Sequence, residues 1–220
     1  RFDPALVRRI ILVGLPAAAM VVFEVGVFAV ATQLIGRIDA VSLAAHQVAL
    51  TLASVTFMVP LGISAAGGVR VGQAVGRGDA QGVANAGWTA FLLGAGFMCL
   101  SGTLFAVAGR WLTGLFSPDP AVIVMGATLL QVAAMFQLFD GTQVVACGVL
   151  RGLGETRLPM FITLVGYWGL GLPIGWFLAF HAGLGARGLW LGLMSGLIAV
   201  GLLLLATWIR KARAFRDART

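Results

Sequence analysis

Long hydrophobic runs separated by short polar breaks dominate this chain of 220 residues. Each run is long enough to cross about 30 Å of hydrocarbon, which takes roughly 20 helical residues. Membrane-spanning strands would alternate in polarity and stop after about ten residues, so the pattern favours helices. The sequence therefore predicts an all-α, polytopic membrane protein with six spans, at about residues 10–35, 43–69, 83–107, 121–150, 159–180 and 189–209.

The basic residues follow the breaks between these runs. Positive charge gathers on the cytoplasmic side of membrane proteins. With both ends of the segment inside, twelve of the 15 Lys and Arg residues lie inside, and only Arg37, Arg110 and Arg187 lie outside. We therefore predict a multi-pass protein of the inner (plasma) membrane with both termini of this segment in the cytoplasm. The inner set is Arg1, Arg8, Arg9, Arg70, Arg77, Arg151, Arg157, Arg210, Lys211, Arg213, Arg216 and Arg219.

Composition excludes the main soluble classes. Hydrophobic residues make up 60% of the chain and charged residues 10%, whereas a soluble domain carries about 25% charged residues. The net charge of +7 belongs to the flanks of the spans, so we expect the lipid bilayer as a partner and no nucleic acid. The chain opens at Arg1 without a methionine or a signal peptide, and we expect it to be an excerpt of a longer protein.

Two carboxylates lie deep in apolar runs. Glu24 is 15 residues after Arg9 and 13 before Arg37, which places it roughly 20 Å from either flank. Asp140 is 11 residues before Arg151, or roughly 16 Å from the inner surface. A charge at this depth costs about 2.5–3.5 kcal/mol on insertion scales, so it needs a functional or structural reason. The similar depth lets the two carboxylates face each other.

Two carboxylates in a poorly hydrated place do not both stay ionised cheaply, so one holds a proton or a cation sits between them. Either outcome couples the pair to an ion gradient. Glutamine amide oxygens beside the pair would suit a small cation, and Gln137 and Gln143 stand three residues on either side of Asp140. The alternative is a buried acid capped by Gln or Ser for packing alone.

For other polar residues the sequence supports a functional role less strongly. Gln47, Thr51 and Ser54 form a stripe that either joins helices or lines a water-filled cavity. His46 is an interfacial hydrogen-bonding residue or a proton relay. Asp119 precedes the Asp140 run, where a helix N-cap competes with an outer contact for cationic substrate.

Prolines inside three runs should kink or loosen the helices, namely Pro16, Pro60 and Pro173. Enzyme motifs are missing from the sequence: it has no nucleophile elbow, Walker loop, His/Cys metal cluster or dinucleotide fingerprint. We therefore expect no enzyme activity and no cofactor.

Several motifs resemble one transporter family. The sequence is similar to the C-terminal half of multidrug and toxic compound extrusion (MATE) transporters of the NorM type, over nearly its whole length. The residues that carry the resemblance are Gly14-Leu15-Pro16 with Glu24 ten residues after the glycine, Ala44-Ala45-His46-Gln47-Val48-Ala49, Phe57-Met58-Val59-Pro60-Leu61-Gly62, Val69-Arg70-Val71-Gly72-Gln73-Ala74-Val75-Gly76, Phe136-Gln137-Leu138-Phe139-Asp140-Gly141 and Gly148-Val149-Leu150-Arg151-Gly152.

The resemblance implies two six-helix lobes related as a parallel repeat, of which residues 1–220 form the second and the N-terminal lobe is absent. It implies export of bulky cationic or amphipathic drugs in exchange for H⁺ or Na⁺. By the resemblance, Glu24 and Asp140 carry the coupling ion, Gln47 lines the same cavity and Asp119 can touch drug. We expect Thr51, Phe136, Gln137 and Gln143 to line the cavity with Gln47.

One position departs from the family pattern. A tyrosine often stands one turn before the intramembrane aspartate, and here that residue is Phe136. Loss of the hydroxyl removes one oxygen donor from a sodium site and favours protons. Two other functions stay open. A related lipid-precursor flippase would carry more basic residues in its cavity, and an accessory structural subunit would carry its carboxylates incidentally.

Overall fold

The computed structural model describes residues 4–218, with side chains at residues 7, 8 and 11–218. All regular elements in this part are helical. In chain order they are α1 (Pro4–Gly36), α2 (Ala40–Arg77), α3 (Ala80–Gly114), α4 (Pro120–Gly152), α5 (Arg157–Leu164), the π-helix η1 (Val165–Gly171), α6 (Leu172–Phe180) and α7 (Gly185–Asp217). Arg1, Arg219 and the Arg9 side chain, which belong to the predicted inner set, lie outside the described residues.

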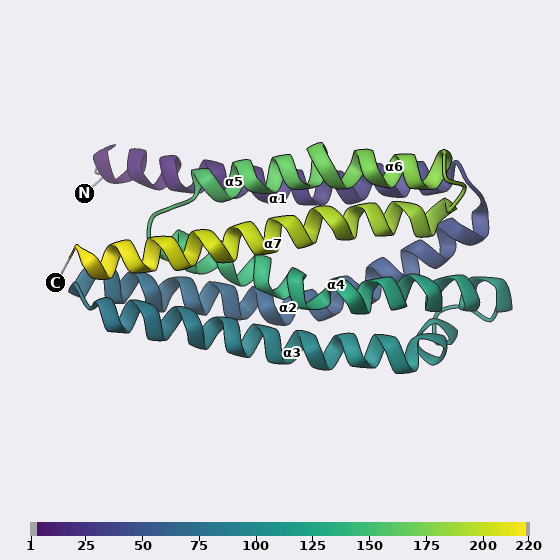
Figure 1. Ribbon diagram of the computed structural model, residues 1–220, viewed down its shortest axis with the longest axis horizontal. Helices are drawn as coiled ribbons and strands as arrows, with labels where there is room; N and C mark the ends of the chain where they lie inside the picture. The colour runs from purple at the N-terminus through teal and green to yellow at the C-terminus, as the bar shows by residue number, and fades with distance from the viewer. Residues whose placement is uncertain (1–3, 219–220) are drawn as a thin grey trace.

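The predicted all-α architecture with six spans is confirmed. Six helical segments among the described residues are long and apolar enough to cross a membrane, and α5, η1 and α6 together make the fifth. The helices run along a common axis, and α1 begins at the same end of the bundle at which α7 ends (Figure 1). An even number of crossings brings the chain back to its starting side.

The helices form two groups with α7 between them. In Figure 1, α1 lies beside α5 and α6, while α2, α3 and α4 lie together on the other side of α7. Helix α4 packs against α2, α3 and α7, and α7 also packs against α6 and η1. Helix α1 packs mainly on α5 and α2. A cavity lies between the two groups, lined by residues of α1, α2, α4, η1 and α7.

The helices are longer than the hydrophobic runs predicted. The polar stretch between the second and third predicted spans is largely helical, because α2 continues to Arg77 and α3 starts at Ala80. Gly78 ends α2 in the left-handed conformation (φ 70°), and its N–H bonds to the carbonyls of Ala74 and Val75. Hydropathy marks only the part of a helix that meets hydrocarbon, whereas caps mark its true ends.

Large apolar side chains point outward along the bundle, as lipid-facing residues should. Helix α3 exposes Leu92, Leu100 and Val107 between two exposed tryptophans, Trp88 and Trp111. These tryptophans stand 23 positions apart, or roughly 35 Å along the helix, which matches aromatic residues at the two interfaces of one bilayer.

Helices α2 and α4 approach each other closely through small residues. A Cβ on Gly68 would lie 2.7 Å from the carbonyl oxygen of Gly148, and a Cβ on Gly148 would overlap Ser64. The Ser64 hydroxyl donates a hydrogen bond of 2.6 Å to the Val144 carbonyl oxygen. Small residues with one interhelical hydrogen bond are typical of helix packing in membranes.

The prolines have different effects. Helices α1 and α2 continue through Pro16 and Pro60, although each proline removes one backbone hydrogen bond and α2 changes direction part-way along its length (Figure 1). The expected interruption near Pro173 takes the form of η1, which ends just before that residue. π-Helical turns in α-helices are uncommon and cluster at functional sites.

Asp39 caps α2, and we predict that removing the cap destabilises the protein mildly and only above acidic pH. Its carboxylate accepts hydrogen bonds from the Ser42 N–H (2.6 Å) and hydroxyl (2.7 Å). Asp39→Ala should cost about 1 kcal/mol, as caps usually do. The backbone hydrogen bond from Ser42 holds the pKa of the Asp39 carboxyl below its ordinary value.

The sign of the pH effect follows from that lowered pKa. The contribution is complete above the unfolded-state pKa of about 4 and disappears as pH falls through the lower folded-state pKa. The melting temperatures of wild type and Asp39→Ala, measured in detergent, should therefore differ at pH 7 and converge in acid. A difference that stays constant down to the acid limit would contradict this account.

Candidate functional site

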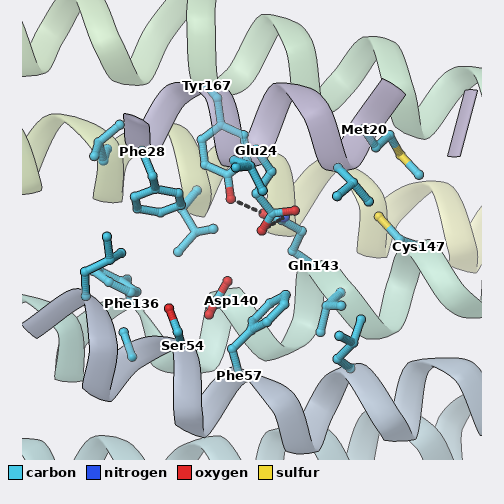
Figure 2. Close-up of a pocket in the computed structure, with 18 of the residues that line it drawn as sticks. Met20, Glu24, Phe28, Ser54, Phe57, Phe136, Asp140, Gln143, Cys147 and Tyr167 are labelled. Atoms are coloured by element: carbon cyan, nitrogen blue, oxygen red, sulfur yellow. Dashed lines mark hydrogen bonds between the residues drawn. The ribbon is translucent and has the colours of Figure 1, made fainter. Parts of the chain in front are cut away.

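An elongated cavity of about 580 Å³ lies between α1, α2, α4, η1 and α7. Its wall is mostly apolar and aromatic, and a few polar side chains point into it (Figure 2). Cavities of this size, with few polar groups in an apolar wall, are typical of sites for small organic molecules. The polar lining residues are Glu24, Thr32, Ser54, Ser64, Asp140, Gln143, Cys147, Arg151, Tyr167 and Trp190.

Glu24 enters the cavity from α1 and is held by a short chain of hydrogen bonds. The Gln143 amide donates from Nε2 to Oε1 of Glu24 at 3.4 Å. The Tyr167 hydroxyl donates to Oε1 of the same glutamine at 2.7 Å (Figure 2). Gln143 and Tyr167 are 2% and 1% exposed, so both hydrogen bonds form away from bulk water. Three helices thus meet at one carboxylate.

Asp140 faces the same cavity from α4. Figure 2 shows its carboxylate directed into the open space between α1 and α2, on the opposite side from Glu24. Among the described residues, Asp140 accepts no hydrogen bond through its side chain, and neither carboxylate forms an ion pair. Arg151 lines the same cavity, but it is 11 residues further along α4, roughly 16 Å away. Neither acid is therefore neutralised by a fixed cation of the described chain.

The two glutamines predicted to lie beside Asp140 on α4 have different surroundings. Gln143 and Asp140 line the cavity, whereas Gln137 is fully buried and donates from Nε2 to the hydroxyls of Thr56 and Ser101, each at 3.0 Å. Successive steps of three residues each fall short of a full turn, so residues six apart point about 120° away from each other. Gln137 therefore joins α2, α3 and α4 and does not line this cavity.

The predicted stripe on α2 reaches the cavity only through Ser54. Gln47 and Thr51 are exposed and do not line this cavity, and the Thr51 hydroxyl donates to the Gln47 carbonyl oxygen at 2.8 Å. Asp119 is exposed as well, and its carboxylate accepts from the Ala121 N–H at 2.8 Å as the N-cap of α4. A transport role for these three residues stays a prediction about surfaces beyond the cavity.

An aromatic wall, formed by Phe136 and Trp190, lines the cavity beside Thr32. The Phe136 and Trp190 rings stack with centroids 5.9 Å apart. The Trp190 indole donates to Nδ1 of His46 at 3.0 Å, and Nε2 of His46 lies 2.8 Å from the Thr32 hydroxyl. His46 is fully buried with both ring nitrogens partnered, which favours the interfacial interpretation over a proton relay.

The sequence interpretation missed Tyr167 and Trp190 as site residues. Tyr167 is the only tyrosine in the chain, and it lies in the glycine-rich stretch Gly166-Tyr167-Trp168-Gly169. A lone phenol in a predicted span was the available signal, because a buried Tyr hydroxyl needs a hydrogen-bond partner. Trp190 gave no such signal, since tryptophan is common near the ends of membrane helices.

Comparison with known proteins identifies the family. The MatE family model matches residues 16–177, well over half of the chain. The chain belongs to the MatE family. This MatE chain is 49% identical over 205 residues to a Mesorhizobium japonicum protein named "Probable multidrug resistance protein NorM", an alignment that covers 91% of the chain and 44% of the relative. It is 46% identical over 204 residues to multidrug resistance protein NorM of Burkholderia vietnamiensis, covering 90% and 44%.

The MatE fold is also found among solved structures. The chain superposes on the eukaryotic MATE transporter AtDTX14 with a TM-score of 0.87 and 23% identity, over 100% of this chain and 51% of that one. The chain thus spans less than half the length of the NorM relatives and about half of the solved transporter. Because MatE proteins are transporters, the expectation that the chain is not an enzyme is confirmed.

Proposed function

We propose that this MatE chain is the C-terminal half of a secondary active efflux antiporter, which exports cationic or amphipathic drugs in exchange for H⁺ or Na⁺. The observation that carries the proposal is the pair of carboxylates, Glu24 and Asp140, that share one cavity without a fixed countercharge in the described chain. A mobile cation then neutralises the pair, and its gradient drives exchange. The relatives' names as multidrug resistance proteins support the choice of cargo.

The rest of the transporter follows from the same proposal. An N-terminal lobe of six helices would complete the molecule, since the relatives are about twice as long as this chain. The basic inner set supports an orientation in which both ends of the present segment lie in the cytoplasm and the protein lies in the inner membrane. The apolar and aromatic cavity wall suits the organic part of a drug, and the carboxylates suit its positive charge.

A reconstitution experiment tests the proposal. The complete protein is placed in liposomes, a proton or sodium gradient is imposed, and movement of a fluorescent cationic dye is followed. We expect gradient-dependent dye movement that stops when an ionophore dissipates the gradient. Dye movement at the same rate with and without either gradient would contradict antiport and favour an accessory structural role. Movement of a labelled lipid precursor in place of dye would favour the flippase, although Arg151 is the only basic residue that lines the described cavity.

A further inference from the structure

Tyr167 holds the amide of Gln143 in one of its two orientations, and this determines which atom the glutamine presents to the carboxylates. The phenol donates to Oε1 of Gln143 at 2.7 Å, which leaves Nε2 facing Glu24. Among the described residues, the Tyr167 hydroxyl has no other hydrogen-bond partner. Turning the amide over would therefore leave a buried phenol proton without an acceptor, which is costly.

The π-helix η1 keeps this contact in place from two neighbouring residues. Tyr167 reaches Gln143 on α4, while the Trp168 indole donates to the Phe23 carbonyl oxygen on α1 at 3.0 Å. The Trp168 ring also packs on Gly26, where an added Cβ would lie 3.2 Å from it. Segment η1 thus fixes the backbone beside Glu24 and the amide in front of it at the same level of the membrane.

The consequence is a shortage of oxygen ligands for a metal cation. Small hard cations are held by several carboxylate and carbonyl oxygens together. Tyr167 keeps the Gln143 carbonyl oxygen directed away from Glu24, and Phe136 offers no oxygen. The uncharged side-chain oxygens that remain in the cavity wall are hydroxyls, from Thr32, Ser54, Ser64 and Tyr167 itself. No group of three acidic, His or Cys side chains in the described chain could hold a metal ion. A proton needs only one carboxylate oxygen.

We propose that Tyr167 is an ion-selectivity residue, which withholds the Gln143 carbonyl oxygen from the carboxylate pair and thereby makes the site select protons over sodium. This inference rests on the proposed antiport. The titratable and charged groups that line the cavity are Glu24 from α1, Asp140, Cys147 and Arg151 from α4 and Tyr167 from η1, while the lining residues of α2 and α7 are uncharged. Tyr167 acts through Gln143 and is a positioning residue.

Tyr167→Phe tests the inference, because it keeps the ring that packs against Phe28 and removes only the hydroxyl. Dye transport by the complete protein in liposomes is measured with a pH gradient and, separately, with a sodium gradient at equal pH. Wild type should respond to the pH gradient and require at least about tenfold more sodium than Tyr167→Phe for half-maximal drive, since the variant loses the penalty for turning the amide. The KM for the dye should stay within about twofold, because Tyr167→Phe removes only a hydroxyl and leaves the stacked Phe136 and Trp190 rings unchanged.

Two further variants separate the explanations. Tyr167→Phe combined with Gln143→Leu should lose the gain in sodium response, because the amide oxygen is gone. Thr103→Val, which removes a hydroxyl on the exposed face of α3, should behave as wild type. Two results would overturn the selectivity inference alone. One is a wild-type protein that sodium drives as well as protons do. The other is a Tyr167→Phe protein that keeps ion-driven transport but has an unchanged sodium response. Dye transport that ignores both gradients overturns the antiport proposal and this inference with it.

Discussion

Glu24→Gln and Asp140→Asn should each reduce ion-driven drug efflux by about 100-fold, the upper end of the range for energetically coupled sites. Each amide has nearly the shape of the acid it replaces, but it can neither bind and release a proton nor balance the charge of a cation. The two acids face one cavity from different helices, so the loss of either removes the like-charge repulsion that makes the pair take up a proton or a cation.

The same substitutions should not destabilise the fold. Both side chains are partly buried and lack an ion pair in the described chain, and an amide at position 24 keeps an oxygen for the hydrogen bond from Gln143. Neutralising them therefore relieves part of the cost of burying a charge. Melting temperatures in detergent should therefore stay at or above the wild-type value while efflux is lost. This combination distinguishes an ion site from acids that are kept for packing.

Drug-resistance growth assays and liposome transport both measure this effect. Glu155→Gln is a matched control, because Glu155 is a carboxylate outside the cavity that forms an ion pair of 2.7 Å with Lys211. That surface pair should be worth less than about 1 kcal/mol and should not alter transport. Wild-type efflux in both cavity variants would end the antiport proposal, whereas loss of efflux together with loss of the folded protein would assign the acids a structural role.

Gly148→Ala should destabilise the protein by about 3 kcal/mol, although alanine is the better helix former by about 1 kcal/mol. A methyl group at this position would overlap the carbonyl and the hydroxyl of Ser64, and backbone atoms cannot move aside as a flexible side chain can. Helices α2 and α4 would have to separate, which would also stretch the hydrogen bond from Ser64 to Val144.

Gly96→Ala is the matched control for that prediction. Gly96 lies within α3 and has no neighbouring atom within 4 Å of an added Cβ. This substitution should leave stability unchanged or raise it by up to about 1 kcal/mol through helix propensity. The measurement is the thermal unfolding midpoint of each purified variant in detergent. Equal midpoints for the two alanine variants would show that α2 and α4 have more room than the structure gives them.

The sequence predicted correctly those features that depend only on how deep a residue lies in the membrane. Six spans follow from hydropathy alone, and the depths of Glu24 and Asp140 follow from their distance along the chain to flanking arginines. The structure places both acids on one cavity, as their equal depth suggested. Their role as the ion site stays a prediction.

The sequence was least informative where the rotation of a helix about its own axis mattered. Gln137 and Gln143 look equivalent around Asp140, yet only Gln143 faces the cavity, because the choice depends on how α4 packs against its neighbours. Tyr167 was missed for a similar reason. Its direction depends on the π-helical register of η1, and that register is set by contacts with α1 and α4 that no local pattern records.

The close packing of α2 against α4 has a consequence for how the cavity changes shape. Asp140 belongs to a tightly joined unit of α2, α3 and α4, while Glu24 stands on α1, which packs more on α5 than on α2 and is hydrogen-bonded to η1. Any tilt of α1 relative to that unit therefore alters the gap between two like charges. Coulomb repulsion between the two carboxylates opposes any movement that brings them closer. A bound cation removes this repulsion, so binding of the ion would permit the movement of α1.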